Sequence, residues 1–163
     1  MNIQVWELLS YVVTVIGLPF AIALFFYERR KERAVEEEEV YELLSRSYHD
    51  FLTLALENPD LHLISKSRTR DLTPEQQERM QAIFGMLISL FERAYLLLYD
   101  DNLSGKEARR WRSWEDFMQE WCERDDFREA IPSLLSGEDP EFAAYVRRLA
   151  EIHQSASRET QPG

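Results

Sequence analysis

Residues 8–33 read LLSYVVTVIGLPFAIALFFYERRKER, a run of twenty residues without a charge followed directly by a charged segment. A helix rises about 1.5 Å per residue, so the uncharged run can cross the roughly 30 Å hydrocarbon core of a bilayer. It lacks the basic start, shorter apolar core and small-residue cleavage site of a secretory signal peptide. We therefore expect residues 1–27 to be a retained transmembrane anchor, with a buried core helix as the alternative.

The charges beside this run predict its orientation. No Lys or Arg precedes it, whereas four follow it: Arg29, Arg30, Lys31 and Arg33. The positive-inside rule then places the amino terminus outside and the carboxy-terminal bulk in the cytoplasm. Cys122 is the only cysteine, so no intramolecular disulfide can form, which agrees with a cytoplasmic domain.

Small residues recur at helical spacing within the run. Thr14, Gly17 and Ala21 could let two transmembrane helices approach closely, as small-xxx-small interfaces do. They could equally be ordinary membrane-helix residues. Self-association through this face is therefore a hypothesis.

Glycine is scarce after the anchor, and apolar residues repeat with a period near 3.6 residues, which is typical of helices. We expect an all-α protein in which a single transmembrane helix precedes a cytosolic bundle of about four to five helices. Residues 28–39 would be a charged juxtamembrane stalk, 40–153 the bundle and 154–163 a flexible polar tail. The net charge of −11 argues against nucleic acid as a partner.

Local signals predict where the helices of the bundle begin and end. Asn58-Pro59 should end the first, and Thr73-Pro74-Glu75-Gln76 should open the next through a capping box. Ser104-Gly105-Lys106-Glu107 has the same capping pattern, while Asp125-Asp126 and Asp139-Pro140 should start the last two helices. The core should contain four apolar stripes, listed here in chain order: Val40, Leu44, Tyr48, Phe51 and Ala55; Met80, Ile83, Phe84, Leu87, Ile88, Phe91, Tyr95 and Leu98; Trp111, Trp114, Met118 and Trp121; Phe142, Tyr145, Val146, Leu149 and Ile152.

Signatures of catalysis and of cofactor binding are absent from the sequence. There is no phosphate-binding loop, no GxGxxG, no HExxH, no CxxC and no Glu-x-x-His pair. The three histidines, His49, His62 and His153, are scattered along the chain. We therefore expect no metal and no cofactor, and leave open whether the protein is an enzyme.

One short pattern, Arg148-Leu149-Ala150-Glu151-Ile152-His153, resembles the Arg-x4-His motif of HEPN-superfamily ribonucleases. The resemblance implies RNA cleavage at a dimer interface, with His153 handling protons and Arg148 stabilising phosphate charge. Leu149 departs from the polar residue that is usual at that position.

Basic residues gather in two clusters, which are candidate sites for an anion or a partner, although a solvated surface is the alternative. They are Lys66, Arg68 and Arg70, and Lys106, Arg109 and Arg110.

The segment YHDFLTLALENPDL at 48–61, the FERAY helix at 91–95 and the helix with Trp111, Trp114 and Trp121 together resemble uncharacterised small bacterial membrane proteins. That resemblance implies one amino-terminal span, a helical cytosolic domain and the bacterial inner membrane, and it transfers no catalytic residue.

We accordingly expect a membrane-tethered helical module that acts on a protein partner or on itself at the cytoplasmic face, with the bilayer as its other contact. Two alternatives remain. One is a membrane-associated bacterial defence effector, either a HEPN-like ribonuclease or an oligomer that perturbs the bilayer. The other is a small-ligand sensor with a pocket between the last helices.

Overall fold

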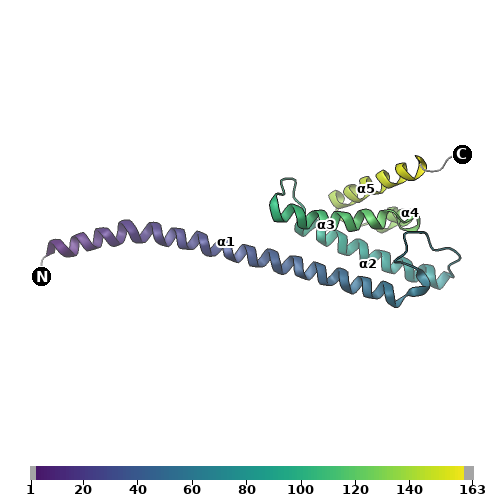
Figure 1. Cartoon of the computed structure of the whole chain (residues 1–163), viewed down its shortest axis with the longest axis horizontal. Coiled ribbons are helices and arrows are strands. Elements are labelled where there is room, and N and C mark those ends of the chain that lie inside the picture. The colour runs from purple at the N-terminus through teal and green to yellow at the C-terminus, as the bar shows by residue number, and fades with distance from the viewer. Residues whose placement is uncertain (1–2, 160–163) are drawn as a thin grey trace. The chain divides into compact units, whose positions relative to one another are not determined.

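The computed structural model describes the backbone of residues 3–159 and the side chains of residues 20–29, 31–32 and 35–153. The described part of the chain is all-helical and has no strand (Figure 1). Its elements are α1 (Ile3–Glu57), the short 3-10 helix η1 (Pro59–Leu61), α2 (Pro74–Leu98), α3 (Gly105–Cys122), α4 (Asp125–Leu134) and α5 (Pro140–Glu159). The all-α prediction is confirmed.

The chain divides into two compact units, residues 1–42 and residues 43–163. In the amino-terminal unit, α1 continues without a break through the predicted stalk. Every side chain from residue 20 to residue 29 is exposed, including Phe20 (68%), Phe26 (60%) and Tyr27 (67%). The side chains of Thr14 and Gly17 lie outside the described residues, and that of Ala21 is exposed.

Two predicted helix ends in the carboxy-terminal unit are formed as the sequence indicated. α1 ends at Glu57, directly before Asn58-Pro59. At the start of α2, the Gln76 backbone N–H donates to Thr73 Oγ1 (3.2 Å), and the Thr73 N–H donates to Gln76 Oε1 (2.9 Å). This reciprocal pair satisfies two N–H groups that the first helical turn would leave without partners.

The second predicted capping box does not form. α3 does begin at Gly105, but the Ser104 side chain makes no cap hydrogen bond. Gly105 has φ +56°, in the left-handed region, so the first residue of the helix does not have helical geometry. A capping box requires the Ser hydroxyl to face the backbone of the third helical residue, and this entry angle prevents that.

The core lies where the apolar stripes predicted it. All four stripes are buried except at their ends, where Val40 and Leu98 are half-buried and Ile152 is 63% exposed. The tryptophan helix α3 points inward, with Trp114 1% exposed, and the Trp121 Nε1–H donates to Tyr48 Oη (3.3 Å). The prediction that the tryptophan face of α3 is core is therefore confirmed.

One helix of the described part, α2, is long and apolar enough by length and composition to cross a membrane. Its most apolar window is 44% buried inside the protein. Nine of its residues are buried, among them Leu87 and Ile88 at 0% exposure, and it packs on α3, α4 and α5. That packing, together with its formed cap, makes α2 the central helix of the bundle.

Cys122 is a free cysteine that lies buried at the end of α3. Burial raises the pKa of this thiol to about 12. The thiolate is the reactive form of cysteine, so the folded protein has an inert thiol at neutral pH.

Candidate functional site

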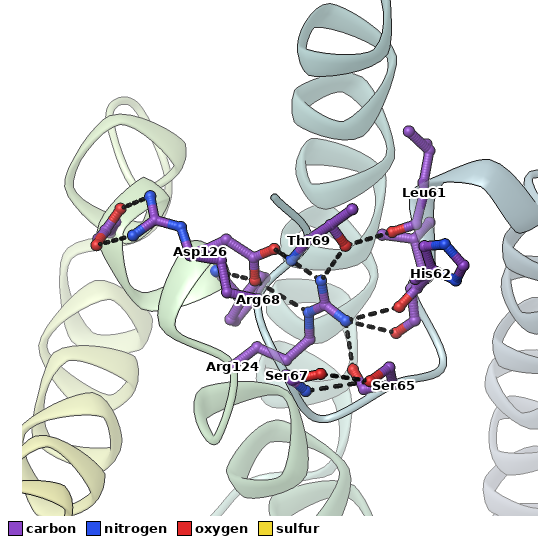
Figure 2. Close-up of polar contacts among 11 residues, drawn as sticks. Leu61, His62, Ser65, Ser67, Arg68, Thr69, Arg124 and Asp126 are labelled. Carbon is purple, nitrogen blue, oxygen red and sulfur yellow. Dashed lines mark hydrogen bonds and ion pairs between the residues drawn. The ribbon is translucent and has the colours of Figure 1, made fainter. Parts of the chain in front are cut away.

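A buried guanidinium of the carboxy-terminal unit is hydrogen-bonded at each of its three nitrogen atoms. Arg124 lies between α3 and α4, and only 2% of it is exposed. Its Nη1 donates to the backbone carbonyls of His62 (2.9 Å), Leu63 (3.3 Å) and Ser65 (Figure 2). Its Nη2 donates to Thr69 Oγ1 at 3.3 Å. One side chain thus holds the loop between η1 and α2 at four points.

Asp126 balances the charge of Arg124. Its Oδ1 accepts from Arg124 Nε at 3.0 Å and its Oδ2 accepts from Arg124 Nη2 at 2.7 Å. The carboxylate also accepts from the backbone N–H groups of Thr69 (3.2 Å) and Phe127 (3.0 Å). A buried ion pair is tolerated when every donor and acceptor is bonded, as here. The pair therefore fastens the loop to the amino terminus of α4.

A cavity of about 660 Å³ lies beside this ion pair. Met80 and Phe84 of α2 are its buried apolar floor, while Gln77, Gln81 and Ser133 supply polar groups. Its remaining lining residues come from the loop and from α4: Arg68, Thr69, Arg70, Asp71, Leu72, Asp126, Glu129 and Ala130. The small-ligand-sensor alternative predicts a pocket between the last helices, whereas this cavity lies between the loop, α2 and α4.

The first basic cluster is largely neutralised by acids that lie far away in the sequence. Lys66 Nζ lies 2.8 Å from Glu123 Oε2. Arg68 forms a bidentate ion pair with Glu129, in which Nη1 donates to Oε1 (2.9 Å) and Nη2 donates to Oε2 (2.6 Å). Arg70 lines the cavity and is exposed, and no ion pair joins it to another described residue. Of the three cations, Arg70 is the one best placed to meet an external anion.

The second basic cluster does not form one exposed patch. Lys106 and Arg109 are exposed, but Arg110 is 8% exposed and belongs to the buried side of α3. Arg110 lies one helical turn before the buried Trp114, on the side of α3 that faces the core, whereas Arg109 lies about 100° around the helix from Arg110 and is exposed.

The pair Arg148 and His153 lies on α5. Arg148 is exposed and its guanidinium carbon is 5.5 Å from the centre of the Tyr145 ring, a cation–π contact, while His153 is half-buried. Tyr145 in turn donates its hydroxyl to Glu115, and burial, followed by that carboxylate, holds the pKa of Tyr145 above its usual value. Arg148 thus has a packing role within the chain.

Two carboxyl groups share a hydrogen bond where α5 begins. Glu92 of α2 accepts from the Asp139 N–H (2.6 Å), and its hydrogen bond to Glu138 raises the pKa of Glu138, with burial and the charge of Glu92 adding to the shift. The folded state therefore holds a proton on Glu138 more tightly than the unfolded chain does. The stabilisation from this proton is present at low pH and is lost as pH rises through the raised pKa.

Replacing Glu138 with glutamine should remove this pH dependence, because an amide donates to Glu92 at every pH. We expect E138Q to melt at a higher temperature than the wild type near pH 7, with the difference shrinking as pH falls to about 5. Thermal unfolding across that range measures the difference. The control E138A removes the charge but cannot donate to Glu92, so its gain near pH 7 should be smaller than that of E138Q; a difference between E138Q and wild type that stays constant with pH would refute the shared proton.

Within the residues whose side chains are described, no group of three or more His, Cys, Asp or Glu is placed to hold a metal ion. The chain matches no protein-family model, no curated protein and no solved structure.

Proposed function

We propose that the protein is a helical interaction module tethered to the cytoplasmic face of a membrane by residues 1–27. The observation that carries this proposal is the exposure of every described apolar side chain between residues 20 and 27, on a continuous helix. Exposed apolar surface of this extent is unfavourable in water and favourable in hydrocarbon. A bilayer is the environment that covers all sides of such a helix at once.

The charges that follow support the proposed orientation. Arg29 and Lys31 come directly after the apolar segment and are exposed, as the positive-inside rule requires on the cytoplasmic side. The guanidinium carbon of Arg29 lies 5.1 Å from the centre of the Phe25 ring, a cation–π contact that covers the last turn of the apolar segment with a positive charge. We propose the bacterial inner membrane as the location of the protein.

Tethering explains how a module without catalytic groups could act. Confinement to a membrane raises the effective concentration of a partner held in the same bilayer, so weak contacts between folded units become productive. The carboxy-terminal unit offers such contacts, with exposed apolar residues that include Leu43 (54%), Met86 (57%) and Leu97 (51%). A protein partner or a second copy is the occupant we propose.

Introducing two positive charges into the apolar run tests whether residues 1–27 anchor the protein in a membrane. Replacing Leu18 and Ala21 with arginine should disfavour insertion by about 5–7 kcal/mol, since each central arginine costs roughly 2.5–3.5 kcal/mol. The wild type should stay with membranes through alkaline carbonate washing, and L18R/A21R should appear in the soluble fraction. The matched control L56R/I152R places the same charges on exposed apolar positions of the other unit and should stay with membranes. A soluble wild type would refute the proposal.

A further inference from the structure

A groove runs between the last turns of α1 and the middle of α2, within the carboxy-terminal unit. α2 runs back alongside this part of α1 (Figure 1). The groove encloses about 540 Å³, and its lining comes from both helices: Ser47, Asp50, Phe51 and Leu54, then Met86, Ser89, Leu90 and Arg93. It is open along one side of a two-helix layer.

A stripe of the same helical spacing runs along each wall of the groove and continues one turn beyond it. On α1 it consists of Leu43, Ser47, Asp50 and Leu54, and on α2 of Met86, Leu90, Arg93 and Leu97. Leu43 and Leu97 lie beyond the lining of the groove, and each stripe combines apolar with polar residues. Such spacing keeps one stripe of each helix facing a neighbouring helix. Within the unit these stripes are incompletely covered, since Leu43, Met86 and Leu97 are each more than half exposed.

Opposite charges stand on opposite walls. Asp50 belongs to α1 and Arg93 to α2, and both are exposed. No ion pair joins either of them to another described residue. A surface that carries one unpaired acid and one unpaired base can complement a copy of itself, because a two-fold axis brings each charge opposite its counterpart.

We propose that a second copy of this chain docks on the groove, so that two α1–α2 layers form a four-helix bundle. An axis parallel to the helices stacks α1 of one copy on α2 of the other, and Asp50 then faces the partner's Arg93 on both sides of the axis. Met86 and Leu97 enter the centre of this bundle and are removed from water.

The axis also agrees with a membrane tether, and in this respect the inference rests on the proposed function. Rotation about a line parallel to α1 leaves the direction of α1 unchanged in both copies. Leu43, where the carboxy-terminal unit begins, therefore lies at the same end of the four-helix bundle in both copies. Two chains that are anchored in one bilayer through their amino termini require this arrangement. A protein partner other than a second copy would need no such symmetry.

Charge reversal tests the pairing in the full-length protein in detergent, where association is measured by energy transfer between labelled copies. D50R alone and R93D alone each place two like-charged pairs across the axis, so we expect dimerisation to weaken at least about tenfold. The double variant D50R/R93D restores opposite charges and should recover the wild-type dissociation constant. The control R148D, which reverses a charge far along the chain on α5, should leave it unchanged.

The outcomes separate this inference from the tether. Unchanged dimerisation in both single variants, or a double variant as weak as the singles, overturns the proposed dimer while membrane extraction can still succeed. Thermal unfolding of each variant verifies that it folds. M86K serves as a second probe, since a buried lysine at the centre of the bundle should also weaken dimerisation at least about tenfold without touching the charged pair.

Discussion

Replacing Arg124 with alanine is expected to lower the free energy of unfolding of the carboxy-terminal unit by about 3–5 kcal/mol, the range found when one partner of a buried ion pair is removed. The variant would leave Asp126, which is 7% exposed, without its compensating charge. It would also leave the carbonyls of His62, Leu63 and Ser65 without their shared donor. An unpaired buried charge costs far more than a lost surface contact.

Chemical denaturation monitored by tryptophan fluorescence measures this loss. The matched control is R68A. It removes the exposed ion pair between Arg68 and Glu129, which also connects this loop to α4. Exposed ion pairs contribute about 0–1 kcal/mol, so R68A should be nearly neutral. Equal losses in R124A and R68A would contradict the role assigned to the buried pair.

Replacing Trp114 with alanine should destabilise the same unit by about 3–5 kcal/mol. Its ring is 1% exposed and makes edge contacts with Tyr48 of α1 (5.8 Å between centres) and Phe117 (5.8 Å). Truncation removes this aromatic packing and leaves a cavity that the bundle cannot fully close.

The control for Trp114 is L56A, at a position that is 66% exposed on α1. Surface substitutions of this kind usually change stability by less than about 0.5 kcal/mol. The two denaturant midpoints should therefore differ clearly. A W114A midpoint close to that of L56A would mean that the tryptophan face of α3 is not the core.

Most of the fold could be predicted from short-range signals. Thr73-Pro74-Glu75-Gln76 fixes the start of α2, and Asn58-Pro59 ends α1, because capping and proline chemistry act within a few residues. Apolar periodicity identified the core for the same reason. The failure at Ser104-Gly105 came from a left-handed glycine, whose φ no pattern of residue types reveals.

The polar site could not be predicted, because its parts are far apart in the sequence. Arg124 sits in the charged segment ERDDFRE, which is typical of a solvated surface, and nothing local indicates that it reaches the carbonyl of His62. Lys66 and Arg68 looked like an anion site until the fold placed Glu123 and Glu129 against them. The cluster at Arg109 and Arg110 divides between two faces of α3 for a reason that helical geometry could have supplied.

Sided labelling of the full-length protein in intact bacterial cells tests the central claim most directly. A cysteine at position 2, from N2C, is compared with one at the exposed position 136, from S136C, using a maleimide that does not cross membranes. The native Cys122, 1% exposed and with a pKa of about 12, should stay unlabelled and needs no removal. We predict labelling of N2C in intact cells and of S136C only after lysis; labelling of both only after lysis, with the protein in the soluble fraction, would contradict the membrane tether.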